Sequence, residues 1–80
     1  MEIKVTAFGI AKDILKGKTT VLKLDEGQTI ADVRQALISN YPDFKKLTSL
    51  QFAVNADYVA EDHIVQSNDE VVLIPPVSGG

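Results

Sequence analysis

Cysteine is absent from this chain of 80 residues. Its absence excludes a disulfide framework, zinc or iron–sulfur centres held by thiolates, and a cysteine nucleophile. It also excludes a persulfide on a side chain. Any sulfur or acyl chemistry must therefore use another atom of the chain.

Long apolar runs are absent as well. No stretch approaches the roughly 20 consecutive apolar residues that a membrane-spanning helix requires, so we expect no membrane partner. The first residues, Met1 to Lys4, lack the charged and then apolar pattern of a secretory signal. We therefore expect a cytoplasmic protein.

Basic residues are few and scattered. The chain has 8 lysines and arginines against 11 aspartates and glutamates, a net charge of −3, and its longest basic cluster is Lys45-Lys46. Such a balance repels phosphate backbones, so we expect no nucleic acid partner. A basic protein surface is the better partner. The acidic pairs at residues 61–62 and 69–70 are candidates to steer one, although such pairs at turns more often only solvate the surface.

Small size argues against a self-sufficient enzyme. A chain of 80 residues buries about 60 to 65% of its unfolded surface, which suffices for one modest core but not for a walled catalytic cavity as well. The single histidine, His63, is interpreted as a solvated loop residue rather than a metal ligand or a base. We expect no metal site.

The first part of the chain predicts a hairpin. Residues 3–8 and residues 19–24 alternate with period two, which is typical of strands. Between them, residues 10–15 follow helical spacing for about one turn, and Gly17 suits a chain reversal. The short connection places the two strands antiparallel.

One main helix is predicted over residues 30–41. Thr29 stands at its N-cap with Asp32 completing a capping box, and Pro42 disfavours its continuation. A single apolar stripe repeats at spacings of three and four, which indicates packing against a sheet. The stripe consists of Ile30, Val33, Leu37 and Tyr41. Residues 43–49 then read as a loop.

The second half of the chain predicts further strands. Residues 50–54 alternate, residues 55–57 form a turn, and a very short strand follows at residues 58–59. Residues 70–74 are too uniformly apolar for an edge strand, so this strand belongs in the middle of the sheet. The order of elements predicts an α+β domain of the β-grasp (ubiquitin-like) type over residues 1–74, with a mixed sheet over one main helix.

An extended C-terminal tail is predicted over residues 75–80. Prolines lack an N–H group and fix φ at about −65°, so the sheet cannot continue through them. Six residues reach up to about 20 Å, far enough to bring a terminal carboxylate into another protein's active site. Two final glycines can pass a slot that is too narrow for any other residue. The tail consists of Pro75, Pro76, Val77, Ser78, Gly79 and Gly80.

Threading this tail requires the body of the domain to dock too. Ordering the last four residues takes roughly 4 to 8 kcal/mol, which contacts elsewhere must offset. Candidates for an apolar docking patch are Phe8, Val59 and Ile74.

The tail and the strand before it resemble the MoaD family, the small subunits of molybdopterin synthase. The resemblance rests on Asn-Asp-Glu-Val at residues 68–71, on the Pro-Pro-Val-Ser-Gly-Gly end, and on the start from Ile3 through Phe8 and a short helix. It spans nearly the whole chain. Asn68 stands for the family's usual glycine, and asparagine tolerates the left-handed φ of a glycine. Ile74 stands where an aromatic residue often precedes Pro-Pro.

The resemblance implies a sulfur carrier that is not itself an enzyme. In that family the terminal carboxylate, on Gly80 here, is adenylated with ATP by a MoeB-like activating enzyme and converted to a thiocarboxylate. The tail then enters the large subunit, MoaE, within a heterotetramer, and the sulfur builds the dithiolene of the molybdenum cofactor. The resemblance also implies that this chain binds no cofactor, that the large subunit holds the catalytic residues, and that Lys12 lies near a basic contact position.

Other functions are compatible with the same residues. A ubiquitin-like modifier joined to lysines of other proteins, or a sulfur carrier for thiamine or tRNA thiolation, would use the same fold and tail. Only the surface of the body separates these functions. A plain interaction module would instead tolerate a residue added after Gly80.

Overall fold

The structure, a computed structural model, describes residues 1–47 and 49–75. Residues 76–80 of the predicted tail, including Gly80, lie outside the described residues. The elements of the described part are, in chain order, β1 (Glu2–Ala7), α1 (Gly9–Leu15), β2 (Thr19–Lys23), α2 (Ile30–Asn40), the 3₁₀ helix η1 (Pro42–Lys46), β3 (Gln51–Val54), β4 (Asp57–Val59) and β5 (Glu70–Ile74).

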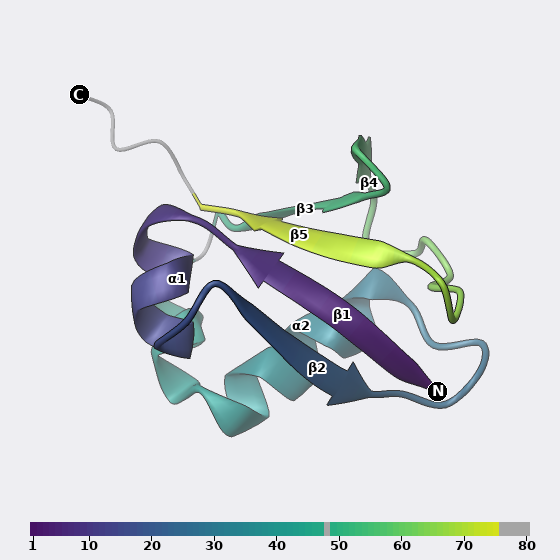
Figure 1. The fold of residues 1–80 in the computed structure, drawn as a ribbon, viewed down its shortest axis with the longest axis horizontal. Coiled ribbons are helices and arrows are strands. Elements are labelled where there is room, and N and C mark those ends of the chain that lie inside the picture. Colours follow the sequence, from purple (N-terminus) through teal and green to yellow (C-terminus); the bar gives the residue numbers. More distant parts are fainter. Residues whose placement is uncertain (48, 76–80) are drawn as a thin grey trace.

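The strands form one mixed sheet in the order β2-β1-β5-β3-β4. β1 and β2 pair antiparallel, as do β3 and β4, whereas β5 runs parallel to β1 and antiparallel to β3. β5 therefore lies in the middle of the sheet, as its dense apolar sequence predicts (Figure 1). This arrangement confirms the β-grasp prediction.

The first hairpin forms with a longer helix in its connection than the sequence predicts. β1 ends at Ala7, because Phe8 is already the N-cap residue of α1, and α1 has seven residues rather than one turn. The chain reversal was expected at Gly17, but Lys16 takes the left-handed conformation, with φ of 60°. Because α1 extends to Leu15, the residue after it must adopt the left-handed conformation that ends the helix. That residue is Lys16, although it is not a glycine.

The predicted capping box at the start of α2 is confirmed. The backbone N–H of Thr29 donates to Asp32 Oδ2 at 2.9 Å, and its hydroxyl donates to the same oxygen at 3.2 Å. α2 ends at Asn40, close to the predicted end. The predicted loop at residues 43–49 is wrong in part, because η1 begins directly at Pro42, a residue whose fixed φ suits a first helical position.

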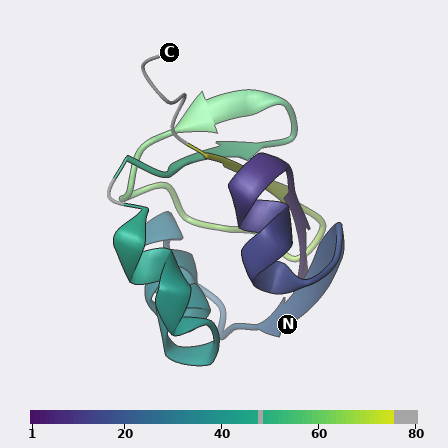
Figure 2. The same cartoon turned by 90° about the vertical axis from the view of Figure 1, so that its left-hand side faces the viewer.

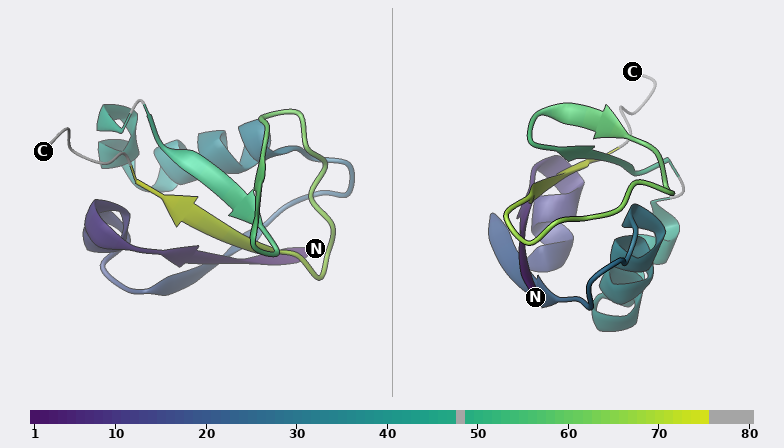
Figure 3. Two further views of the ribbon diagram at one scale, coloured as in Figure 1. Left: turned by 90° about the horizontal axis from the view of Figure 1, so that it is seen from above. Right: turned by 90° about the vertical axis from the view of Figure 1, so that its right-hand side faces the viewer.

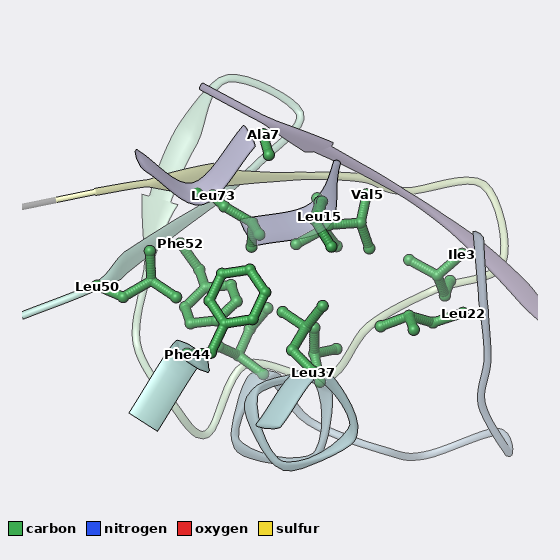
Figure 4. Close-up of a cluster of buried hydrophobic side chains, with 14 of the residues drawn as sticks. Ile3, Val5, Ala7, Leu15, Leu22, Leu37, Phe44, Leu50, Phe52 and Leu73 are labelled. Carbon is green, nitrogen blue, oxygen red and sulfur yellow. The ribbon is translucent and has the colours of Figure 1, made fainter. Parts of the chain in front are cut away.

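One hydrophobic core lies between the sheet and both α-helices. Figure 4 shows Val5 and Leu73 from the strands on one side of this layer and Leu37 and Phe44 on the other. Residues of α1 belong to the same cluster as residues of α2, so both helices cover the same face of the sheet. Figures 2 and 3 show that this face is the concave side of the curved sheet. No helix in the described ranges has the length and apolar character to cross a membrane.

Two polar residues join the turn between β3 and β4 to the start of β5. Asn55, with φ of 51°, accepts a hydrogen bond from the backbone N–H of Glu70 at 3.1 Å and donates one to Asp69 Oδ1 at 2.9 Å. Asp69 Oδ2 in turn accepts from the N–H of Gln66 at 2.8 Å and closes the preceding turn. Asn68, which stands for the family's usual glycine, does not take the left-handed φ that asparagine tolerates: among the described non-glycine residues only Lys16, Asn55 and Ala56 do so.

We expect the substitution Asn55→Ala to lower the free energy of unfolding by about 2 kcal/mol, because it removes two side-chain hydrogen bonds and leaves a residue with a Cβ atom in a left-handed conformation without local support. Urea denaturation measures this loss. Asn55→Gly is the matched control, since it removes the same hydrogen bonds but tolerates the positive φ. An alanine variant as stable as the glycine variant would show that the backbone conformation contributes nothing.

Candidate docking face and tail root

The root of the tail lies at the end of the central strand. Pro75 is the last described residue and is half-buried. The parallel register pairs Ala7 of β1 with Leu73 of β5, so the start of α1 stands beside the end of β5. A Cβ atom built on Gly9, whose φ is 56°, would lie 3.3 Å from Pro75 Cγ. The glycine thus lets the proline ring rest directly against the first turn of α1.

The side of the sheet away from the helices carries an apolar centre. Val72 of β5 lies opposite Thr6 of β1 and opposite Ala53 of β3, and Ala53 lies opposite Tyr58 of β4. These four residues therefore form one row across the sheet, on the face that the core residues do not use. We call this side the outer face. Its strand residues are Glu2, Lys4, Thr6, Thr19, Val21, Lys23, Gln51, Ala53, Tyr58, Glu70, Val72 and Ile74, and Phe8 follows β1 at the end where the tail begins.

Large apolar side chains on the outer face are exposed. Phe8 is 49% exposed and Tyr58 is 68% exposed, and Val21 of β2 is also exposed. Val72 and Ile74 are half-buried. Exposed apolar groups on one face of a small domain make that face a candidate docking surface. The face begins at the root of the tail, because Ile74 ends β5 and Phe8 directly follows the end of the neighbouring strand β1.

The structure brings together two of the four predicted docking residues. Phe8 and Ile74 directly follow the paired residues Ala7 and Leu73, so both lie at the same end of the sheet. Val59 pairs with Phe52, so it lies on the concave side and packs against the core. Lys12 is exposed on α1, one helical turn after Phe8.

Sequence reasoning missed most of the outer face. Thr6, Ala53, Tyr58 and Val72 were not predicted as docking residues. The length of the turn at residues 55–56 could have revealed this face. A two-residue connection from β3 to β4 places Tyr58 opposite Ala53. The choice of Val59 was one residue away from the side chain that points outward.

The acidic pairs proposed to steer a partner differ in their surroundings. Glu61 forms a two-pronged ion pair with Arg34, with N–O distances of 2.9 and 3.0 Å, and this guanidinium also donates to the Leu50 carbonyl at 2.9 Å. Asp69 closes the turn before β5. Glu70 alone among these residues lies on the outer face, where it is 3.8 Å from Lys4 Nζ.

His63 has a backbone role in the structure. Its carbonyl accepts a hydrogen bond from the N–H of Ile30 at 3.0 Å. The loop that contains His63 therefore binds a backbone N–H group of the first turn of α2, which has no partner within the helix. The side chain is half-buried rather than fully solvated. Within residues 1–47 and 49–75, no group of three or more histidine, aspartate or glutamate side chains is arranged to hold a metal ion.

Comparison with known proteins finds relatives along the whole chain. Residues 5–80 match the ThiS family. The chain is 33% identical over 81 residues to a molybdopterin synthase sulfur carrier subunit from Arabidopsis thaliana, covering 100% of this chain and 84% of the relative. It is 34% identical over 85 residues to a protein of the same description from Dictyostelium discoideum, covering 99% and 96%.

Two solved structures share the fold at lower identity. SAMP1 from Haloferax volcanii superposes with a TM-score of 0.87 at 21% identity, covering 100% of both chains. A complex of subunits 1 and 2 of the molybdopterin-converting factor from Helicobacter pylori contains a chain that superposes with a TM-score of 0.68 at 22% identity, again covering 100% of both chains.

Proposed function

Because this chain belongs to the ThiS family, we propose that it is the sulfur carrier subunit of a molybdopterin synthase. The observation that carries the proposal is the similarity, over the full chain, to sulfur carrier subunits that are 33% and 34% identical. The final Gly79-Gly80 and the outer face beside the tail root support it independently.

The loading point in this proposal is the carboxylate of Gly80. A carboxylate is a poor electrophile, so an activating enzyme of the MoeB type first joins it to AMP from ATP and releases pyrophosphate. Hydrosulfide supplied by a sulfur donor then attacks the carbonyl carbon, the bond to AMP breaks so that AMP leaves with one of the former carboxylate oxygens, the proton of the hydrosulfide is lost to water, and a thiocarboxylate remains on the chain end. The absence of cysteine fits this scheme, because the carried sulfur needs no side chain.

The tail and the outer face have separate tasks in the transfer step. We propose that residues 75–80 enter the large subunit, of the MoaE type, while the outer face docks on its surface. Glycines at the end pass a narrow slot, and apolar contacts of Phe8 and Ile74 offset the entropy lost by the tail. Lys12, exposed on the same end of α1, is a further candidate contact, whereas Val59 supports the face from the core side.

Chemistry on the pterin precursor is assigned to the large subunit in this proposal. The chain itself supplies the sulfur atom and no catalytic side chain, and it holds neither a metal nor a cofactor. The Helicobacter pylori complex of two subunits supports a large-subunit partner for this chain. A heterotetramer, a cytoplasmic location and the division into a domain at residues 1–74 and a tail at residues 75–80 belong to the same proposal.

Intact-mass spectrometry of the protein isolated from its own cells tests the proposal. We expect a species in which one oxygen atom is exchanged for one sulfur atom, together with a larger copurifying subunit. Treatment with iodoacetamide should alkylate this species once, although the chain has no cysteine. A ladder of conjugates on lysines of other proteins would instead indicate the modifier function, and an unmodified end in every preparation would contradict both.

A further inference from the structure

Glu70 differs from Glu61 in how its carboxylate is satisfied. The carboxylate of Glu61 is held by Arg34 at 2.9 and 3.0 Å, within normal hydrogen-bond range. The carboxylate of Glu70 has two long contacts within the described residues: 3.4 Å from the hydroxyl of Thr6 and 3.8 Å from Lys4 Nζ. Both distances exceed those of strong charge-assisted hydrogen bonds.

The position of Glu70 exposes it to a docked partner. It is the first residue of β5, two positions before Val72 on the same face, so its carboxylate borders the apolar centre of the outer face. Its side chain is 50% exposed, and that of Lys4 is 60% exposed. The weak contacts leave most of the acceptor positions of the carboxylate to water.

A partner that covers the outer face must remove this water. A carboxylate that loses its water without gaining a cation strongly opposes binding. Lys4 cannot compensate well from 3.8 Å, because a flexible ammonium group holds a carboxylate less firmly than a guanidinium fork does. The partner surface must therefore supply the positive charge.

We propose that Glu70 is a specificity-determining residue of the outer face, which selects a partner with an arginine beside its apolar contact surface. The inference rests on the proposed function, because it takes the large subunit as that partner. It adds the chemistry of the recognised group: a guanidinium that accommodates the carboxylate of Glu70 next to the site where Val72 and Ile74 are covered. Lys4, which carries the same sign as this guanidinium, then opposes binding.

Binding of the full-length chain to the purified large subunit of the same organism tests this inference. Stopped-flow and equilibrium measurements over a range of salt concentrations give kon, koff and Kd. We expect Glu70→Gln to raise Kd about tenfold and to reduce the dependence of kon on salt, because one attractive charge is lost at the interface. Lys4→Gln should lower Kd about two- to threefold, since it removes a repelling charge.

Asp62→Asn is the matched control. It removes the same charge from an exposed loop residue whose neighbours, Glu61 and His63, accept hydrogen bonds from the first turn of α2, away from the outer face. Its Kd should stay within about twofold of the wild type, because salt screens charges outside the interface. Melting temperatures of all variants establish that folding is intact.

The opposite signs expected for Glu70→Gln and Lys4→Gln decide the outcome. If Lys4 is the true counter-ion of Glu70 in the complex, both substitutions will weaken binding, and the inference is overturned. Equal effects of Glu70→Gln and Asp62→Asn overturn it as well. A wild-type chain that does not bind the large subunit at all refutes the proposed function together with the inference, whereas tight binding without an effect of Glu70→Gln refutes the inference alone.

Discussion

A single alanine appended after Gly80 is expected to abolish sulfur loading while leaving the melting temperature nearly unchanged. The proposed chemistry occurs at one carboxylate, and an added residue turns that carboxylate into an amide bond and places a new carboxylate beyond the two glycines. Adenylation depends on the alignment of the reacting atoms, and a displacement of about 1 Å can lower a rate by about 100-fold. An extension of one residue moves the reacting carbon by about 3.5 Å.

Loading is measured as ATP-dependent pyrophosphate exchange with the activating enzyme and as the mass of the product. The control adds an alanine at the other end of the chain, before Met1, which gives a protein of the same length and composition. Full loading of the C-terminally extended chain would show that the reaction does not depend on the position of the chain end, whereas a wild-type chain that is not loaded would exclude the carrier function and leave the plain interaction module. An extended chain that unfolds at a lower temperature would show that the added residue disturbs more than the chain end.

Replacing Phe8 with aspartate is expected to weaken binding to the large subunit by about 30-fold or more, equivalent to about 2 kcal/mol. Phe8 is 49% exposed and directly follows Ala7, which pairs with Leu73, so it lies near the root of the tail, where the proposed docking face and the proposed threaded tail would meet. The substitution should not harm folding through the helix, because Phe8 is the N-cap residue of α1 and aspartate is a preferred N-cap residue. Isothermal titration calorimetry measures the affinity.

Ile64→Asp is the matched control for this substitution. Ile64 is 50% exposed, but it pairs with Thr29 before α2 and is not part of the outer face. It therefore places the same new charge on an equally exposed apolar position elsewhere on the domain. Similar losses of affinity for both variants would mean that added negative charge, rather than the loss of the Phe8 contact, weakens the complex.

The sequence predicts the strands and the main helix well because their signals are local. Alternation in residues 3–8 and the capping box at Thr29 depend on neighbours within a few residues, and both are confirmed. The position of β5 could be predicted too, because a strand covered on both sides must avoid polar residues. The errors occur where two elements meet without a gap: at Phe8, which leaves the strand to cap α1, and at Lys16, which takes the turn conformation expected of Gly17.

The candidate site was predictable only in part, because a docking face is a property of several strands at once. Ile74 could be found from its position before the tail, since both lie in one segment. Tyr58 and Thr6 lie on the face because of the register of β4 with β3 and of β1 with β5, which composition does not reveal. The same limit explains why Glu61 and Glu70 looked alike in the sequence, although one is held by Arg34 and the other borders the outer face.

The tail continues from β5, the middle strand of the sheet, which is hydrogen-bonded to β1 on one side and to β3 on the other. A pull on the tail therefore acts along the axis of β5 and loads these hydrogen bonds in shear, so that they must yield together. A pull across the strands would instead break such bonds one at a time. In the proposed transfer, a partner that pulls the tail along the axis of β5 would therefore leave the sheet that anchors it intact.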